Sequence, residues 1–246
     1  MLQKPTVTRT PPKVNGKDAH VVAIRSLDLP KSLKILKPAI NMANAAFEEA
    51  YGSLVAPDQR TRWTGGAAQF IQETHPSDAV TLFLTSKPSL LPFVKPRVYA
   101  MVTFEPYVGK DKATAGPLAL PILPAEPNQK LWSVKALAVD GKCQGGGLAK
   151  WLMQQVEIFT TATALANGFA SSRLVLNTIR AGRIEGFYQR MEWRTLEETD
   201  IPAGVFGSPD GFTILRMEKV NDLTGKAAVA VAAPFTAAVE DHVTVR

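Results

Sequence analysis

The segment VDGKCQGGGLAK, residues 139–150, places three consecutive glycines between two stretches of different pattern. Before it, residues 131–139 (LWSVKALAV) are rich in apolar and β-branched residues and have the length of a buried strand. After it, apolar residues recur three or four positions apart, as in an amphipathic helix: Leu148, Trp151, Leu152, Val156 and Phe159. The segment is therefore predicted to be a turn from a strand into a helix.

The glycines of this turn indicate a close approach between the backbone and an anion. The first amides of a helix have no helical partner and lie at the positive end of the helix dipole. Gly145, Gly146 and Gly147 carry no side chain that would shield such amides, so a phosphate group is the natural guest. A plain tight turn before a helix explains the glycines equally well when they are considered alone.

Spacing separates the known kinds of phosphate loop. A Walker loop requires Lys and then Ser or Thr directly after its last glycine, whereas Leu148 and Ala149 follow Gly147 here. The dinucleotide fingerprint requires a Gly or Ala where Lys150 stands, and no clear βαβ repeat precedes the loop. The first reading fails and the second is weak.

The remaining pattern, Gln144-Gly-Gly-Gly-Leu-Ala149, resembles the pyrophosphate loop of the GNAT superfamily of acyl-CoA N-acyltransferases. That loop has Gln or Arg, two residues, Gly, one residue, and then Gly or Ala, and every specified position is matched. The resemblance extends over about residues 18–220 and is closest to fungal members, judging from GFYQRMEWRT (186–195) followed by GFTILRMEK (211–219).

The expected elements follow the GNAT order. Strands are predicted at 20–24, 79–85, 98–104, 131–139, 173–179, 193–196 and 212–217, and helices at 32–51, 67–73, from 148, and at 183–191. Pro38 is expected to kink or split the first helix. The predicted fold class is α/β, with a GNAT-like mixed, mostly antiparallel splayed sheet flanked by helices.

Length and composition agree with one substantial core, since the chain has 246 residues of which 46% are hydrophobic. The predicted organisation is a flexible basic leader (1–17), a GNAT-like acyltransferase domain (18–220) and an Ala/Val-rich C-terminal tail (221–246). Between Glu105 and Lys130 lie five prolines and two glycines, which indicate a surface excursion that is either a lid or an insertion.

The charge distribution and the cysteine content limit which partners and which cellular compartment are expected. The net charge of +6 arises in residues 1–40, because the rest of the chain has equal numbers of basic and acidic residues. That basic region has neither stacking aromatics nor a nucleic-acid motif, so nucleic-acid binding is not expected. No stretch is long and apolar enough for a membrane span, and the scattered His20, His75 and His242 suggest no metal site. With Cys143 as the single cysteine, we expect a cytoplasmic protein, with the nucleus as an alternative.

The resemblance implies a binding site for acetyl-CoA or coenzyme A. In this family the sheet splays after its central strand, here near residues 136–139, so that the pantetheine arm can bond to exposed backbone as an added strand. Residues 144–149 would hold the pyrophosphate, and the N–H near Val139 would polarise the thioester carbonyl. Lys142, Lys150 and Arg180 are candidates for the remaining phosphate charge. The implied cofactor contacts are Ala138, Val139, Lys142, Gln144, Gly145, Gly146, Gly147, Leu148, Ala149, Lys150, Asn177 and Tyr188.

Two residues are expected to be catalytic. Tyr188 would be the acid for the leaving thiolate, because the family often has a Tyr in the corresponding helix, although a core role for Phe187 and Tyr188 is an open alternative. For the base that deprotonates the amine we favour Glu105, at the end of a strand expected to border the acceptor site. Asp140 and Glu49 are alternatives between which no spacing rule decides.

The sequence departs from the family pattern at two positions. Glu192 stands where Gly is usual, so the turn into the last strands is expected to form without free access to positive φ. Ala181-Gly182 replaces the Asn that often opens the last helix, with Asn177 earlier on the preceding strand. Both departures affect the end of the expected active site.

The sequence thus predicts an N-acetyltransferase that transfers an acetyl group from acetyl-CoA to a small-molecule or peptide amine. Transfer would be direct, in a ternary complex, without a metal or a covalent enzyme intermediate. Two alternatives stay open: a catalytically silent acyl-CoA-binding or sensing module, and a nucleotide-binding protein that uses the same glycine loop. The acceptor and the oligomeric state are not determined by the sequence.

Overall fold

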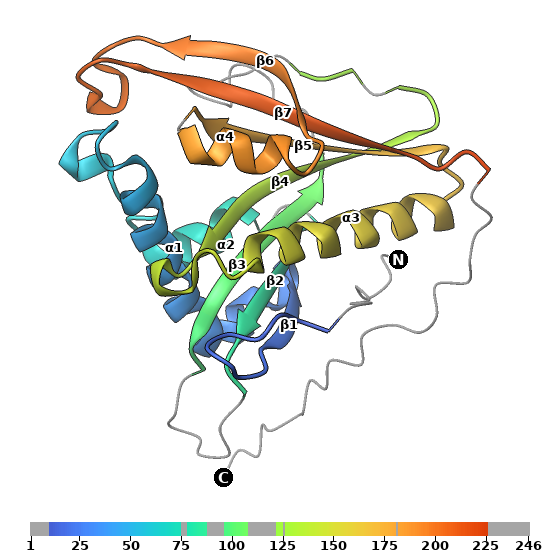
Figure 1. Cartoon of the computed structure of the whole chain (residues 1–246), viewed down its shortest axis with the longest axis horizontal. Coiled ribbons are helices and arrows are strands. Elements are labelled where there is room, and N and C mark those ends of the chain that lie inside the picture. Colours follow the sequence, from blue (N-terminus) through green and yellow to red (C-terminus); the bar gives the residue numbers. More distant parts are fainter. Residues whose placement is uncertain are drawn as a thin grey trace.

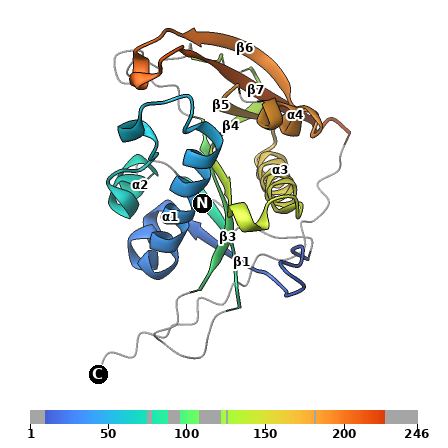
Figure 2. The ribbon, with the colours of Figure 1, turned by 60° about the vertical axis from the view of Figure 1, so that its left-hand side comes forward.

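Two predicted strands are buried along nearly their whole length and lie inside the sheet. β2 (Val80–Thr85) is buried at every position, and β3 (Val98–Pro106) at all but the last. Such continuous apolar strands require cover on both faces. The computed structural model, which describes residues 10–74, 78–87, 96–107, 122–124, 126–180 and 182–225, provides that cover with helices on both sides of the sheet (Figures 1 and 2).

Seven strands form one sheet in the order β1-β2-β3-β4-β5-β7-β6. All neighbouring strands are antiparallel except β4 and β5, which are parallel. A parallel pair needs a long crossover, and α3 supplies it. The remaining strands are β1 (His20–Arg25), β4 (Gln129–Val139), β5 (Ser171–Ile179), β6 (Arg194–Ile201) and β7 (Phe212–Asp222).

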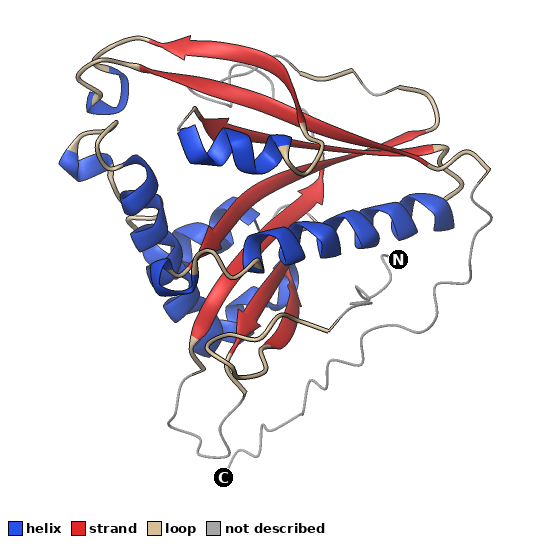
Figure 3. Ribbon diagram, viewed as in Figure 1, coloured by secondary structure: helices blue, strands red, loops and turns tan. Residues whose placement is uncertain are grey.

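The sheet separates the core into two parts, and helices cover each face. α1 (Leu33–Tyr51) and α2 (Gly66–Thr74) cover one face, and α3 (Leu148–Ala166) covers the other (Figures 2 and 3). The short α4 (Gly182–Gln189) follows β5. Short 3-10 helices complete the elements: η1 (Ser26–Ser32), η2 (Pro57–Gln59), η4 (Gly141–Cys143) and η5 (Val205–Gly207).

The predicted fold class is confirmed, and the differences are local. Pro38 lies inside α1 but does not split it. β6 and β7 are longer than predicted, and β7 ends at Asp222, inside the predicted tail. In the predicted leader, Val14 is buried in the core on the α3 side of the sheet. Residues 1–9, most of the Pro-rich segment and residues 226–246 lie outside the described residues.

The turn between α4 and β6 differs from the expectation. We expected it to form without free access to positive φ, and Glu192 nevertheless adopts φ +66°. The left-handed conformation is reached because Met191 N–H and Trp193 N–H both donate to the Tyr188 carbonyl, at 2.9 and 3.1 Å, and close the end of the helix. A residue with a Cβ therefore occupies a conformation that favours glycine.

Candidate functional site

The strand-to-helix turn has the geometry that its sequence predicts. β4 ends at Val139, and the Asp140 carboxylate accepts a hydrogen bond from Lys142 N–H at 3.0 Å, which fixes the start of η4. Gly145 and Gly147 have φ values of +79° and +76°, and a Cβ at either would meet no atom within 4 Å. These glycines are thus required by the backbone conformation, and open space lies beside them.

A run of consecutive amides faces that open space. The first helical hydrogen bond of α3 joins Trp151 N–H to the Gly147 carbonyl at 2.9 Å. No acceptor among the described residues contacts the amides of Gly145 to Lys150. Below them, Cys143 and Leu148 are buried and anchor the loop to the core. The loop therefore presents unpaired donors at the positive end of a 19-residue helix, which is the geometry of an anion site.

The three basic residues predicted to bind phosphate differ in whether they already form ion pairs with carboxylates of the protein. Lys142 and Lys150 are exposed, and neither forms an ion pair among the described residues. Arg180 lies at the end of β5 and pairs with Glu185, at 3.5 Å, and with Glu198. The two lysines are therefore better placed than Arg180 to neutralise an anion on the loop.

Asp140, one of the alternative bases, is engaged at the end of β4. Its carboxylate lies 2.9 Å from the Arg97 guanidinium. Burial alone would raise the pKa of Asp140, but the hydrogen bonds from Arg97 and from Lys142 N–H outweigh it and hold the pKa below its usual value. A carboxylate with a lowered pKa is a weaker base, and in this position Asp140 caps the start of η4.

The sheet opens where β4 and β5 separate. Their pairing ends at Val134 and Leu176, and beyond it the two strands diverge (Figure 1). Lys135 causes this change in β4: Thr103 pairs with Ala136 and Phe104 with Val134, so Lys135 is an extra residue, a β-bulge. We call the unpaired stretch, residues 135–139 of β4 and 177–179 of β5, the splay.

Alternation along each strand determines which backbone groups face the splay. Asp140 N–H donates to the Tyr99 carbonyl of β3, so the peptide groups of Leu137 and Val139 point away from β3. Ala138, opposite Met101, has the reverse orientation, with its peptide group directed toward β3.

The same alternation applies to β5. Arg180 N–H donates to the Thr213 carbonyl of β7, so the peptide groups of Asn177 and Ile179 point away from β7 and toward the splay. Among the predicted contacts, Val139 and Asn177 thus line the splay, whereas Leu137 was missed although strand alternation could have indicated it.

Tyr188 lies on α4 in a nearly closed apolar setting. It is 7% exposed and packs against Phe187 and Trp193, with ring centroids 5.1 and 5.8 Å away. Burial raises the pKa of its phenol well above the usual range, and the nearby Tyr51 adds to the effect. Among the described residues its hydroxyl has no hydrogen-bond partner. Tyr188 therefore packs as a core aromatic, and its role as the acid stays a prediction.

The predicted base Glu105 lies at the end of β3 and is 7% exposed. Its carboxylate is 2.9 Å from the ammonium of Lys135, the bulged residue of β4. The structure thus places Glu105 beside the closed end of the splay, but with a cationic partner that the sequence did not indicate. Sequence spacing could not find this pair, because it depends on the strand register.

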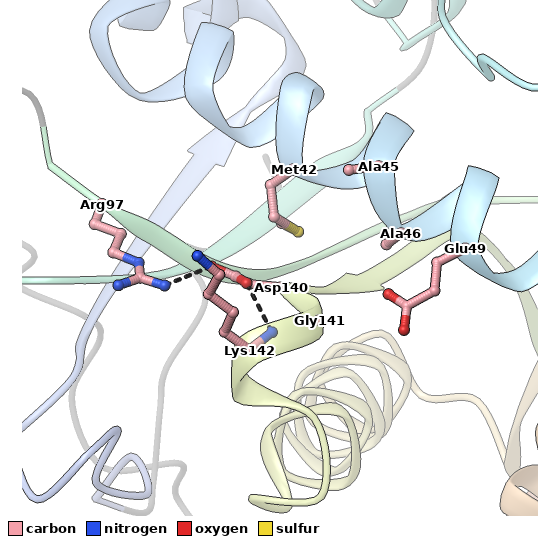
Figure 4. Close-up of a pocket in the computed structure, with 8 residues that line it drawn as sticks. All are labelled: Met42, Ala45, Ala46, Glu49, Arg97, Asp140, Gly141 and Lys142. Atoms are coloured by element: carbon pink, nitrogen blue, oxygen red, sulfur yellow. Dashed lines mark hydrogen bonds and ion pairs between the residues drawn. The ribbon is translucent and has the colours of Figure 1, made fainter.

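Glu49, the other alternative base, does not lie in the splay but lines a pocket between α1 and η4 (Figure 4). Its carboxylate accepts a hydrogen bond from the Gln144 side chain at 3.3 Å. A Cβ at Gly141 would lie 2.8 Å from the same carboxylate, so a larger residue there would displace the Glu49 side chain. The pocket has a volume of about 270 Å³ and its lining is part apolar and part charged: Met42, Ala45, Ala46, Glu49, Arg97, Asp140, Gly141 and Lys142.

Tyr51 is a further residue that the sequence analysis did not select. It is the last residue of α1, and its hydroxyl lies 3.1 Å from Thr178 Oγ1 on β5. Burial raises its pKa, and the hydrogen bond with Thr178 partly opposes that shift. No sequence signal distinguishes this tyrosine from an ordinary aromatic residue of an amphipathic helix.

Comparison with known proteins gives structural but not sequence relatives. No family model matches the chain, and no curated protein does. An inferred phosphinothricin N-acetyltransferase has 13% identity and a TM-score of 0.50, with 82% of this chain and 98% of that chain covered. NAA60 of Arabidopsis thaliana in complex with a bisubstrate analogue has 15% identity, a TM-score of 0.49, and coverages of 82% and 100%. PaiA N-acetyltransferase of Thermoplasma acidophilum in complex with coenzyme A has 13% identity, a TM-score of 0.47, and coverages of 82% and 98%.

The chain therefore has the GNAT fold: a seven-stranded, largely antiparallel sheet flanked by helices, with a parallel pair of strands that diverges beside a glycine loop. At these identities the likeness establishes the fold and leaves the activity to be argued from the site. Within the described residues, no helix has the length and apolarity that crossing a bilayer would require.

Proposed function

We propose that this protein is an N-acetyltransferase that transfers the acetyl group of acetyl-CoA directly to a primary amine in a ternary complex. The observation that carries the proposal is the run of unpaired amides from Gly145 to Lys150 placed next to unpaired strand edges. A diphosphate fits the first feature, and an extended arm with two amides of its own fits the second. A single ligand that combines both chemical groups is a coenzyme A thioester.

The residues that would hold the cofactor follow from this arrangement. The amides of Gly145 to Ala149 and the exposed Lys142 and Lys150 would bind the diphosphate, whereas the predicted Gln144 N–H already donates to the Gly141 carbonyl at 3.4 Å. The peptide groups of Leu137, Val139 and Asn177 would pair with the arm, as an added strand does. When bound, acetyl-CoA supplies an activated acetyl group on sulfur. Ala138 contributes its small side chain rather than its peptide group, which is directed to β3.

Transfer forms a bond between nitrogen and carbon, breaks the bond between carbon and sulfur, and moves two protons. Val139 N–H, directed into the splay, would polarise the thioester carbonyl; loss of one such donor elsewhere costs about 3 kcal/mol of transition-state stabilisation. Tyr188 is protonated at neutral pH, as an ordinary phenol is, and would donate to the leaving sulfur as negative charge develops there. Burial raises its pKa further, which keeps the proton on the phenol until the sulfur departs. Glu105 would accept the proton of the amine, with Lys135 as the group that orients its carboxylate.

The test is titration of the purified protein with coenzyme A and with acetyl-CoA by calorimetry, followed by release of free thiol across a panel of amines. Binding of both ligands with thiol release supports the acetyltransferase. Binding without thiol release for any amine favours an acyl-CoA-binding module. Binding of ATP or NAD in the same calorimetric titration, without binding of coenzyme A, favours a nucleotide-binding protein and overturns the proposal.

The acceptor class, a small-molecule or peptide amine without nucleic acid or membrane, is part of the proposal. The cytoplasmic location and the closeness to fungal members also stay predictions. The acceptor is best identified by a crystal structure of the protein soaked with acetyl-CoA and searched for bound density near the thioester.

A further inference from the structure

The splay divides the sheet into two halves, one of β1–β4 with α1 and α2 and the other of β5, β6 and β7, with α4 directly after β5. On one face of the sheet α3 packs against β3, β4 and β5 and so contacts both halves. Beyond Val134 and Leu176 no backbone hydrogen bond joins β4 to β5 in the described part of the chain. The position of the second half relative to the first is thus set there by side chains and loops.

Tyr51 makes such a connection. Its helix packs on β3 and β4, whereas its hydroxyl bonds to Thr178, two residues beyond the last β5 residue that pairs with β4. The ring is held in place by Phe47, one turn earlier in α1, with centroids 5.0 Å apart. The hydroxyl bond therefore spans the splay from the α1 side.

A second contact joins the same halves. Gly207 of η5 lies against Ala56, in the connection between α1 and α2, so closely that a Cβ at Gly207 would clash with the Cβ of Ala56. This contact is van der Waals only, whereas the bond between Tyr51 and Thr178 is directional. Tyr51 is also close enough to Tyr188 for the charges of the two phenols to interact. The α1 tyrosine thus reaches the place where the arm of the cofactor would end.

We propose that Tyr51 is a positioning residue of the acyl-transfer site, whose hydroxyl bond to Thr178 holds β5 and α4 at the distance from β4 that the arm of coenzyme A requires. The inference rests on the proposed function. It adds a role for a residue outside the glycine loop, and it predicts that this role concerns the arm and not the phosphates.

The experiment compares two ligands by calorimetry: coenzyme A, and adenosine 3′,5′-bisphosphate, which has phosphates but no arm. Tyr51→Phe keeps the ring and removes the hydroxyl, and Thr178→Val removes the partner. We expect each variant to bind coenzyme A about three- to tenfold more weakly, the range for loss of one hydrogen bond, and to bind the bisphosphate as the wild type does. The double variant should be no weaker than either single variant, because all three lack the same bond.

Tyr107→Phe is the matched control, since it removes a phenol hydroxyl that accepts a hydrogen bond from Leu123 N–H at 3.3 Å, outside the splay. It should leave both affinities unchanged. Equal weakening of both ligands by Tyr51→Phe, unchanged affinity for coenzyme A, or tighter binding would each overturn the inference. Failure of the wild type to bind coenzyme A at all would instead overturn the proposed function, and the inference with it.

Discussion

The Arg97 guanidinium lies 2.9 Å from the carboxylate of Asp140, the residue that follows β4 and begins the glycine loop. The pair joins the start of β3 to the start of the loop, and the Arg97 side chain also lies over the Tyr99 ring, 5.5 Å from its centroid. It therefore fixes the loop to the sheet at the point where the amides begin to turn outward.

Replacement of Arg97 by Met should lower the free energy of unfolding at pH 7 by less than about 1 kcal/mol, because the pair is partly exposed. The folded pKa of Asp140 is lowered, so its contribution is present above its unfolded pKa of about 3.9 and is lost as the pH falls through the folded pKa. Denaturation of both proteins between pH 2 and pH 7 should therefore show a difference that disappears at the acid end. A constant difference would mean that Arg97 acts through packing alone.

Replacement of Gly147 by Asp should abolish binding of coenzyme A, since it puts a carboxylate beside the amides expected to hold the diphosphate. The matched control is Gly168→Asp in the turn after α3. Gly168 has φ +75°, close to the +76° of Gly147, and open space beside it. Both variants incur the same backbone strain, of about 1–2 kcal/mol. Equal affinity for coenzyme A in the two variants would refute the assignment of the loop.

Tyr188→Phe should reduce the rate of acetyl transfer about a hundredfold while binding of coenzyme A changes little, because the hydroxyl would act on the leaving sulfur. The phenol stays protonated at neutral pH, so the wild-type rate should show no loss assignable to Tyr188 between pH 6 and pH 9. The measurement is kcat as a function of pH for both proteins. A variant as active as the wild type would leave Tyr188 with its packing role alone.

Glu192→Gly should raise the free energy of unfolding by about 0.5–1 kcal/mol, because glycine adopts the φ of +66° without strain, although it adds entropy to the unfolded chain. Glu192→Gln is the control, since it removes the carboxylate that lies 3.6 Å from Lys219 but keeps the strain. Chemical denaturation of the three proteins separates the two effects. Stabilisation by Gln and not by Gly would point to charge rather than to the backbone.

Elements with a strong local pattern could be predicted from the sequence. The start of the helix at Leu148 and the bounds of the apolar strands were predicted to within two residues, and the glycine loop indicated the GNAT-like fold. The loop was also the part of the site with a local signal, because positive φ and free amides restrict the residue type at each position.

The rest of the site depends on contacts that are distant in the sequence. Lys135 meets Glu105 through the register of β3 and β4, and Tyr51 meets Thr178 across 127 residues of chain. Neither pair produces a motif, since each partner is ordinary in its own element. The positive φ of Glu192 was missed for another reason: hydrogen bonds to Tyr188 impose it against the local preference of the residue.

The extra residue at position 135 has a consequence for how such sites can be recognised. Ahead of it, Trp132 and Val134 belong to the core on the α3 side, and behind it Leu137 and Val139 pack against the same core, one position out of phase. Deleting this one amino acid would remove the bulge and restore unbroken alternation, with Leu137 and Val139 still on the face of Trp132 and Val134. Part of the capacity to receive a ligand is thus encoded by a count of residues rather than by their chemistry, and comparisons of residue identity alone would not detect it.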